Sequence, residues 1–106
     1  MIKVTLLKSL NVRSGQVPLR FRLRDGDDVD LLFDTGRMVE ADDLAVFSPD
    51  GKARARLHAY NPQLKRDVDG YMFAMNAVYL EMVQSGVQVD EESFRRAMMD
   101  RLGEGM

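Results

Sequence analysis

The chain has 106 residues and a formal net charge of −2; 45% of its residues are hydrophobic and 30% are charged, as is typical of one soluble globular domain. It contains no cysteine and a single histidine, which excludes disulfides, thiolate chemistry and histidine-rich metal sites. No stretch of about 18 apolar residues occurs, and Lys3 and Lys8 interrupt the apolar N-terminal run. The sequence therefore predicts neither a membrane span nor a secretion signal, and a cytoplasmic location is expected.

The charges are distributed in blocks of alternating sign. Residues 1–24 sum to +6, residues 25–50 to −8, residues 51–66 to +5, residues 67–92 to −6 and residues 93–106 to +1. The blocks can pair with one another across the fold, or one basic block can face a polyanion. Both interpretations stay open from charge alone.

Three segments near the N-terminus alternate apolar and polar residues, which is the pattern of strands buried on one face. These segments are residues 2–8, 17–24 and 28–34. In the second segment the apolar side is Leu19, Phe21 and Leu23, and the polar side is Arg20, Arg22 and Arg24. The sequence predicts a three-stranded sheet with a row of arginines on its open face.

The second and third strands are expected to form a hairpin around Asp25-Gly26-Asp27, because Gly26 readily takes a positive φ. A three-residue loop places apolar side chains opposite apolar ones, which a two-residue loop does not. The predicted pairs are Leu23 with Val29, Phe21 with Leu31, Leu19 with Phe33, Arg24 with Asp28 and Arg22 with Asp30. Arg20 would then face Leu32 and be the least neutralised arginine.

The second half of the chain predicts two helices. Asn61-Pro62 is a strong helix start, and Gly86 ends the run after Ser85. An apolar stripe at helical spacing contains Leu64, Val68, Tyr71, Met72, Met75, Tyr79 and Met82. Asp90 caps a second, shorter helix whose apolar side is Phe94, Met98 and Leu102. The fold class is therefore α+β: a three-stranded antiparallel sheet packed on one long C-terminal helix plus a second shorter helix.

The region between sheet and helices is less regular. After Thr35-Gly36 the chain loses clear periodicity until the turn predicted at Ser48-Pro49-Asp50-Gly51. Residues 52–59 then alternate, with Lys52, Arg54 and Arg56 on one side. This segment is interpreted as a short strand with a basic edge, and a helix is the alternative.

No catalytic, metal or cofactor site is predicted. Asp28, Asp30 and Asp34 line one strand face, but nothing predicts the cleft that acid–base chemistry requires. The acidic run after Asp25 lacks the ligand spacing and closing glutamate of a calcium loop. Phosphate-binding loops and nucleophile elbows are absent from the sequence as well.

Several of these segments together resemble a known family. They are the run from Val17 to Gly26, Thr35-Gly36, the helix opened by Asn61 and the segment Ser85 to Asp90. Their order resembles the N-terminal arm DNA-binding domain of tyrosine-type integrases from Bacteroides-like mobile elements, over nearly the whole chain. The resemblance implies a three-stranded sheet that enters the major groove of arm-type sites. It also implies core-binding and catalytic domains in the same parent chain, and it leaves self-association on DNA open.

The resemblance implies the following DNA-binding residues: Arg20, Arg22, Arg24, Lys3, Thr5, Lys8 and Arg13, with the basic segment Lys52, Arg54 and Arg56 as further candidates. Two features depart from the family pattern. The third strand is acidic, and Leu44 stands where the family often has an aromatic residue. The acids would tune or suppress contacts on one half of the sheet, which leaves as the better candidates Arg20, Lys3, Lys52, Arg54 and Arg56.

The expected organisation is one arm-type DNA-binding domain over residues 1–102 and a linker over residues 103–106. The chain lacks the catalytic Arg, His-x-x-Arg and Tyr set of the family, so we expect it to bind double-stranded DNA without cleaving it. The alternative is a protein-interaction or oligomerisation module in which the charges pair internally and Met98 or Met99 faces a neighbour.

Overall fold

The computed structural model describes residues 2–7, 14–46, 55–57 and 61–104, and its elements follow the predicted order. A three-stranded antiparallel sheet, in the order β1-β2-β3, consists of β1 (Ile2–Leu7), β2 (Gln16–Asp25) and β3 (Val29–Glu40). A short 3-10 turn, η1 (Ala41–Asp43), leads to a two-stranded sheet of β4 (Leu44–Val46) and β5 (Ala55–Leu57). Two helices follow, the long α1 (Pro62–Gln84) and the shorter α2 (Glu91–Glu104). The α+β class is confirmed.

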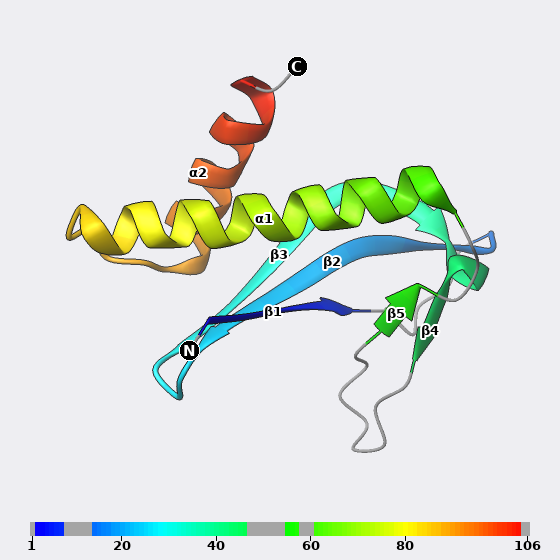
Figure 1. Ribbon diagram of the computed structural model, residues 1–106, viewed down its shortest axis with the longest axis horizontal. Coiled ribbons are helices and arrows are strands. Elements are labelled where there is room, and N and C mark those ends of the chain that lie inside the picture. The colour runs from blue at the N-terminus through cyan, green and yellow to red at the C-terminus, as the bar shows by residue number, and fades with distance from the viewer. Residues whose placement is uncertain (1, 8–13, 47–54, 58–60, 105–106) are drawn as a thin grey trace.

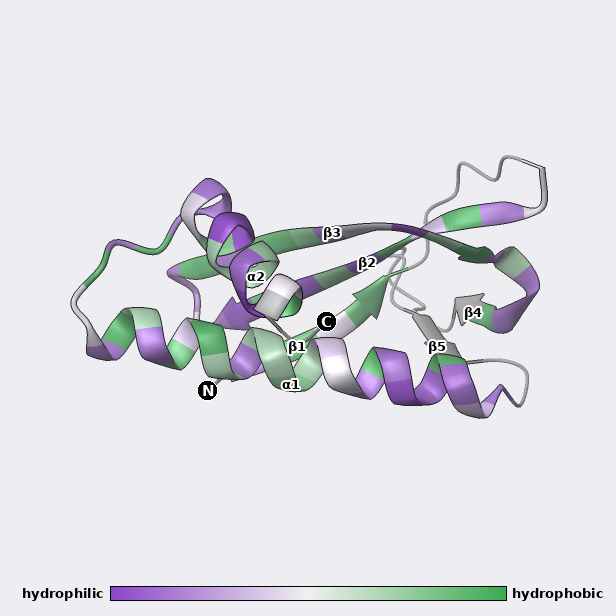
Figure 2. Cartoon of the chain, turned by 90° about the horizontal axis from the view of Figure 1, so that it is seen from above, coloured by the Kyte–Doolittle hydropathy of each residue, from purple (hydrophilic) through white to green (hydrophobic). Residues whose placement is uncertain are grey.

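Both helices pack on one face of the three-stranded sheet, and the core lies between them and the sheet (Figure 1). Phe21 of β2 contacts Tyr71 of α1 with ring centroids 5.6 Å apart. Phe33 of β3 meets Phe94 of α2 edge to face at 6.4 Å. Figure 2 shows α2 between α1 and β3. The predicted apolar faces of the strands and of both helices are therefore the buried ones.

The hairpin loop has three residues as predicted, but it lies one residue further along the chain, at 26–28. Leu23 is opposite Leu31 and Phe21 is opposite Phe33, so the predicted register is wrong by two residues. A shift of two preserves both faces, which is why the alternation alone could not distinguish the two registers. Asp25 stays in β2, where its Oδ2 accepts a hydrogen bond of 2.8 Å from the Tyr79 hydroxyl.

Strand β3 does not end at Thr35-Gly36 but continues to Glu40 through a β-bulge. The register shifts between Pro18 and Arg20, so that residues 35–37 lie opposite Leu19. The Thr35 hydroxyl donates to the Leu19 carbonyl oxygen at 2.9 Å, and Gly36 takes a φ of +78°. Because the bulge interrupts the alternation of apolar and polar residues, the sequence pattern does not predict that the strand continues.

The predicted helix ends are confirmed. Asn61 Oδ1 accepts from the Leu64 amide at 3.1 Å, with Pro62 in the first turn. At the other end Gly86 has a φ of +72°, and the Val87 amide reaches the Met82 carbonyl oxygen at 3.1 Å, which is a Schellman motif. Asp90 Oδ1 accepts from the Ser93 amide at 2.8 Å and caps α2.

The structure describes only part of the segments on which the remaining predictions fall. Residues 55–57 form β5, which agrees with the strand interpretation of the 52–59 segment; the other residues of that segment, and the turn predicted at Ser48 to Gly51, lie outside the described residues. Residues 103–104, expected as linker, are the last residues of α2. Across the described ranges, no helix is long and apolar enough to cross a lipid bilayer.

Two glycines are expected to respond in opposite directions to the same substitution. Gly36→Ala should lower the free energy of unfolding by about 1 kcal/mol, because an L side chain is strained at its φ of +78°. Gly70→Ala should raise it by up to about 1 kcal/mol, since Gly70 lies inside α1 and an added Cβ meets nothing within 4 Å. Urea denaturation measures both, and changes of the same sign would contradict the assignment of the bulge.

Candidate nucleic-acid interface

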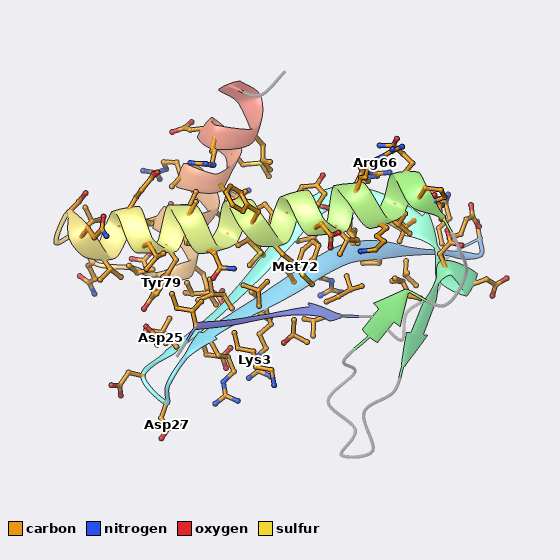
Figure 3. All side chains as sticks on the ribbon, in the orientation of Figure 1. Lys3, Asp25, Asp27, Arg66, Met72 and Tyr79 are labelled. Atoms are coloured by element: carbon orange, nitrogen blue, oxygen red, sulfur yellow. The ribbon has the colours of Figure 1, made fainter. Side chains whose placement is uncertain are left out.

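The face of the three-stranded sheet away from the helices is open and strongly charged. The strand registers bring nine side chains onto this open face: Lys3, Thr5, Leu7, Arg20, Arg22, Arg24, Asp30, Leu32 and Asp34. Figure 3 shows Lys3 on the side of the sheet away from α1. The predicted arginine row of β2 is thus confirmed as an exposed or half-exposed feature.

Charge changes sign across the open face. The β1 and β2 side carries Lys3 and the three arginines, whereas the β3 side carries Asp30 and Asp34. Beyond β3, the first turn of α2 adds Glu91 and Glu92. A shallow depression of about 360 Å³ joins these regions and is lined by Arg20, Leu32, Asp34, Glu91, Glu92 and Arg95. The open face therefore has a basic half, on β1 and β2, and an acidic half, on β3 and the start of α2.

Among the three arginines of the β2 row, Arg22 is the one most tightly held by a carboxylate. Its Nε and Nη2 donate to the two carboxylate oxygens of Asp30 at 2.7 and 2.5 Å, which is a bidentate pair. The predicted Arg22–Asp30 pairing is therefore confirmed, although Leu32 is directly opposite Arg22 and the contact runs diagonally. The hydrogen bonds from Arg22 lower the pKa of Asp30, and the same bonds raise the pKa of Arg22.

Arg20 and Arg24 have different surroundings from those expected. Arg20 lies opposite Asp34, with its Nε 3.9 Å from a carboxylate oxygen, so the expectation that it faces Leu32 is wrong. The register shift of two residues is the cause. Arg24 lies opposite Asp30 rather than Asp28, between that residue and Lys3 of β1. Neither Arg24 nor Lys3 forms a salt bridge with another described residue, although the charge of Arg24 contributes to the lowered pKa of Asp30.

The other predicted contact residues are only partly placed. Thr5 lies opposite Arg22 on the open face and is half-buried. Arg56 belongs to β5, a strand that lies close to β1, but its side chain is not described. Four further candidates fall outside the described residues: Lys8, Arg13, Lys52 and Arg54.

Several interactions that position this face were not predicted. Arg37, the single base of the acidic block, forms a 2.5 Å ion pair with Asp67 of α1 and fastens the end of β3 to the helix. Its hydrogen bond lowers the pKa of Asp67. Glu91 Oε1 accepts from the Leu32 amide at 3.4 Å, which occupies an edge of the sheet. The one sequence signal for the Arg37–Asp67 pair is the position of Arg37 as the single base within an acidic block.

The site has no features of a metal centre within the part of the chain that the structure describes, where no cluster of three or more potential ligands occurs. Comparisons with protein-family models, with curated proteins and with solved structures found no match to this chain. The geometry and charge of the open face are therefore the observations that bear on function.

The Arg22–Asp30 pair predicts a pH-dependent contribution to stability. Asp30→Asn should lower the free energy of unfolding at pH 7 by about 0.2–1 kcal/mol, the range of exposed cross-strand ion pairs. Because the pKa of Asp30 is lower in the folded state, its contribution is present above the unfolded pKa of about 3.9 and is lost as the pH falls through the folded pKa.

Urea denaturation at neutral and acidic pH measures this contribution. The difference between wild type and variant should shrink in acid. Asp27→Asn, in the exposed hairpin loop, is the matched control. A difference that stays constant with pH would mean that the carboxylate charge of Asp30 does not stabilise the sheet.

Proposed function

We propose that this chain binds duplex DNA through the basic half of its open sheet face, as a non-catalytic arm-binding domain of a tyrosine recombinase. One observation carries the proposal: two adjacent strands place Lys3, Arg20, Arg22 and Arg24 on a face that no helix covers. Cations held at strand spacing on a rigid sheet suit the regular phosphates and base edges of a duplex. The resemblance noted from the sequence points to the same use of the sheet.

The geometry suggests a division of roles on the basic half. A two-stranded β-ribbon fits the major groove, which is about 12 Å wide. Lys3 and Arg24, which form no salt bridge within the described residues, are the candidates for phosphate contacts. Arg20 has only a loose 3.9 Å contact with Asp34, so its guanidinium is available to read a guanine edge.

The acidic half of the face supports a particular placement of the duplex. Phosphates would be repelled by Asp30, Asp34 and the glutamates at the start of α2, and attracted by the cations of β1 and β2. The duplex would therefore lie off-centre, over β1 and β2. Arg22 must share its guanidinium between Asp30 and DNA, which moderates affinity.

In this proposal the chain acts with core-binding and catalytic domains of the same parent protein, in the cytoplasm and without a cofactor. Self-association on DNA is compatible with it. The proposal assigns the chain recognition of arm-type sites, and DNA cleavage is assigned to the catalytic domain.

A second candidate function is a protein-interaction module in which the charge blocks only stabilise the fold. The bidentate Arg22–Asp30 pair favours it, because one arginine of the row already binds a carboxylate of the same protein. A double-mutant cycle on this pair tests whether Arg22 only stabilises the fold or also contacts DNA. If the coupling appears only in stability and the double variant retains DNA affinity, Arg22 is structural; if affinity falls, Arg22 contacts DNA.

Fluorescence anisotropy with a labelled duplex at several salt concentrations tests DNA binding directly. Each phosphate contacted should contribute about −0.9 to the slope of log affinity against log salt. Lys3→Gln and Arg24→Gln should each reduce the slope by about one contact. Asp30→Asn should tighten binding by removing a repulsive charge. Lys65→Gln, on α1 and away from the open face, is the control. Absence of binding by a folded sample at low salt would refute the proposal.

Sequence selectivity is expected to depend on Arg20. Selection from a pool of randomised duplexes yields a preferred site, and Arg20→Ala should weaken that site more than a random duplex, by about 1–3 kcal/mol. Equal weakening of both duplexes would show that Arg20 positions the protein and does not read bases.

A further inference from the structure

A groove lies on the helical side of the molecule, between the first half of α1, the end of α2 and the bulge of β3. Its volume is about 670 Å³. The residues that line it are Thr35, Arg37, Arg66, Asp67, Gly70, Tyr71, Phe73, Ala74, Met99, Arg101, Leu102 and Gly103. Arg66 projects from the side of α1 away from the sheet (Figure 3), so the groove and the open sheet face are separate surfaces.

The floor of the groove is apolar and unusually exposed. Phe73 is 71% exposed, which makes it the most exposed large hydrophobic residue among those described, and Met99 is 40% exposed. Leu102 and Tyr71 are half-buried beside them. The inner stripe of α1 already packs on the sheet, so Phe73 has no role in the core. A contiguous exposed apolar surface with a polar rim is typical of a protein interaction site.

Gly70 leaves the backbone of α1 exposed in the groove, at a cost in helix stability. A glycine inside a helix costs about 1 kcal/mol relative to alanine. A Cβ at Gly70 would meet nothing within 4 Å, and its φ is not positive, so neither packing nor backbone conformation requires a glycine here. The missing side chain instead allows another backbone to approach α1 closely.

The rim of the groove is positively charged. Three arginines and one aspartate line the groove, and with Glu81, which pairs with Arg101, the local charge is +1, whereas the whole chain carries −2. Arg37 pairs with Asp67, and Arg101 lies 3.3 Å from Glu81. Arg66 donates to the Gln63 side-chain oxygen at 3.0 Å and, within the described residues, forms no salt bridge, although its charge also acts on the nearby Asp67. A surface of this kind favours carboxylates on its occupant.

We propose that this groove binds an acidic amphipathic helix of a partner protein. Apolar side chains of that helix would pack on Phe73 and Met99, its backbone would approach Gly70, and its carboxylates would contact Arg66 and Arg101. The apolar floor fits one face of a helix and offers nothing to a phosphate backbone. The proposal does not rest on DNA binding, because the groove and the open sheet face have no residue in common.

Titration of the full isotope-labelled chain with a synthetic peptide tests the proposal. The peptide is a helix of about four turns with leucines at helical spacing and glutamates elsewhere, and its matched control carries lysine at every glutamate. Amide shifts from the acidic peptide should cluster on Gly70, Phe73, Met99 and Gly103. The lysine peptide should bind about tenfold more weakly or not at all.

Two variants locate the binding surface. Gly70→Leu should weaken the acidic peptide about tenfold or more by filling the groove, while its better helix propensity keeps the protein folded. Gln84→Leu, at the exposed end of α1 and outside the groove, should have no effect. Arg66→Gln should weaken binding several-fold and reduce its salt dependence.

Three outcomes would overturn the proposal. Peptide shifts confined to the open sheet face would mean that the acidic peptide only pairs with the arginine row of β2. Undiminished binding by Gly70→Leu would exclude the groove. Broadening of the groove resonances with protein concentration alone, together with a dimer in sedimentation, would identify a second copy of this chain as the occupant.

Discussion

Burial of the apolar side of β2 and β3 beneath α1 and α2 is the constraint on which the rest of the structure depends. Because side chains alternate along a strand, placing Phe21 and Phe33 in the core forces the arginines of β2 to the opposite face. Neither helix covers that face, since both pack on the apolar side of the sheet. The hydrophobic core thus determines where the protein presents charge.

The open face combines stabilising ion pairs with exposed cations on the same strands. Arg22 is held by Asp30, and the Asp30 carboxyl has a lowered pKa as a result, whereas Lys3 and Arg24 have no such partner in the described part of the chain. Ion pairs of this exposure stabilise the fold weakly. Their larger consequence is spatial, because the acids of β3 confine the positive potential to β1 and β2.

The helical side differs in kind from the sheet side. Its groove is apolar with an arginine rim, whereas the open face is polar throughout apart from Leu7 and Leu32. Arg37 and Asp67 join the two sides by fastening the β-bulge of β3 to α1. Because the two surfaces have no residue in common, the two proposed ligands would not compete for the same place.

The sequence by itself determined the strands of the first sheet as far as Asp34, their inner and outer faces, both helices and their caps, because alternation, helical spacing and capping are local patterns; β4 has no such pattern. Only the tertiary structure decided the hairpin register, since a shift of two residues leaves every face unchanged. It also decided that Arg20 lies near Asp34, that β3 continues past Gly36, and that Phe73 remains exposed. Each of these depends on which distant residues meet, and a local pattern carries no information about that.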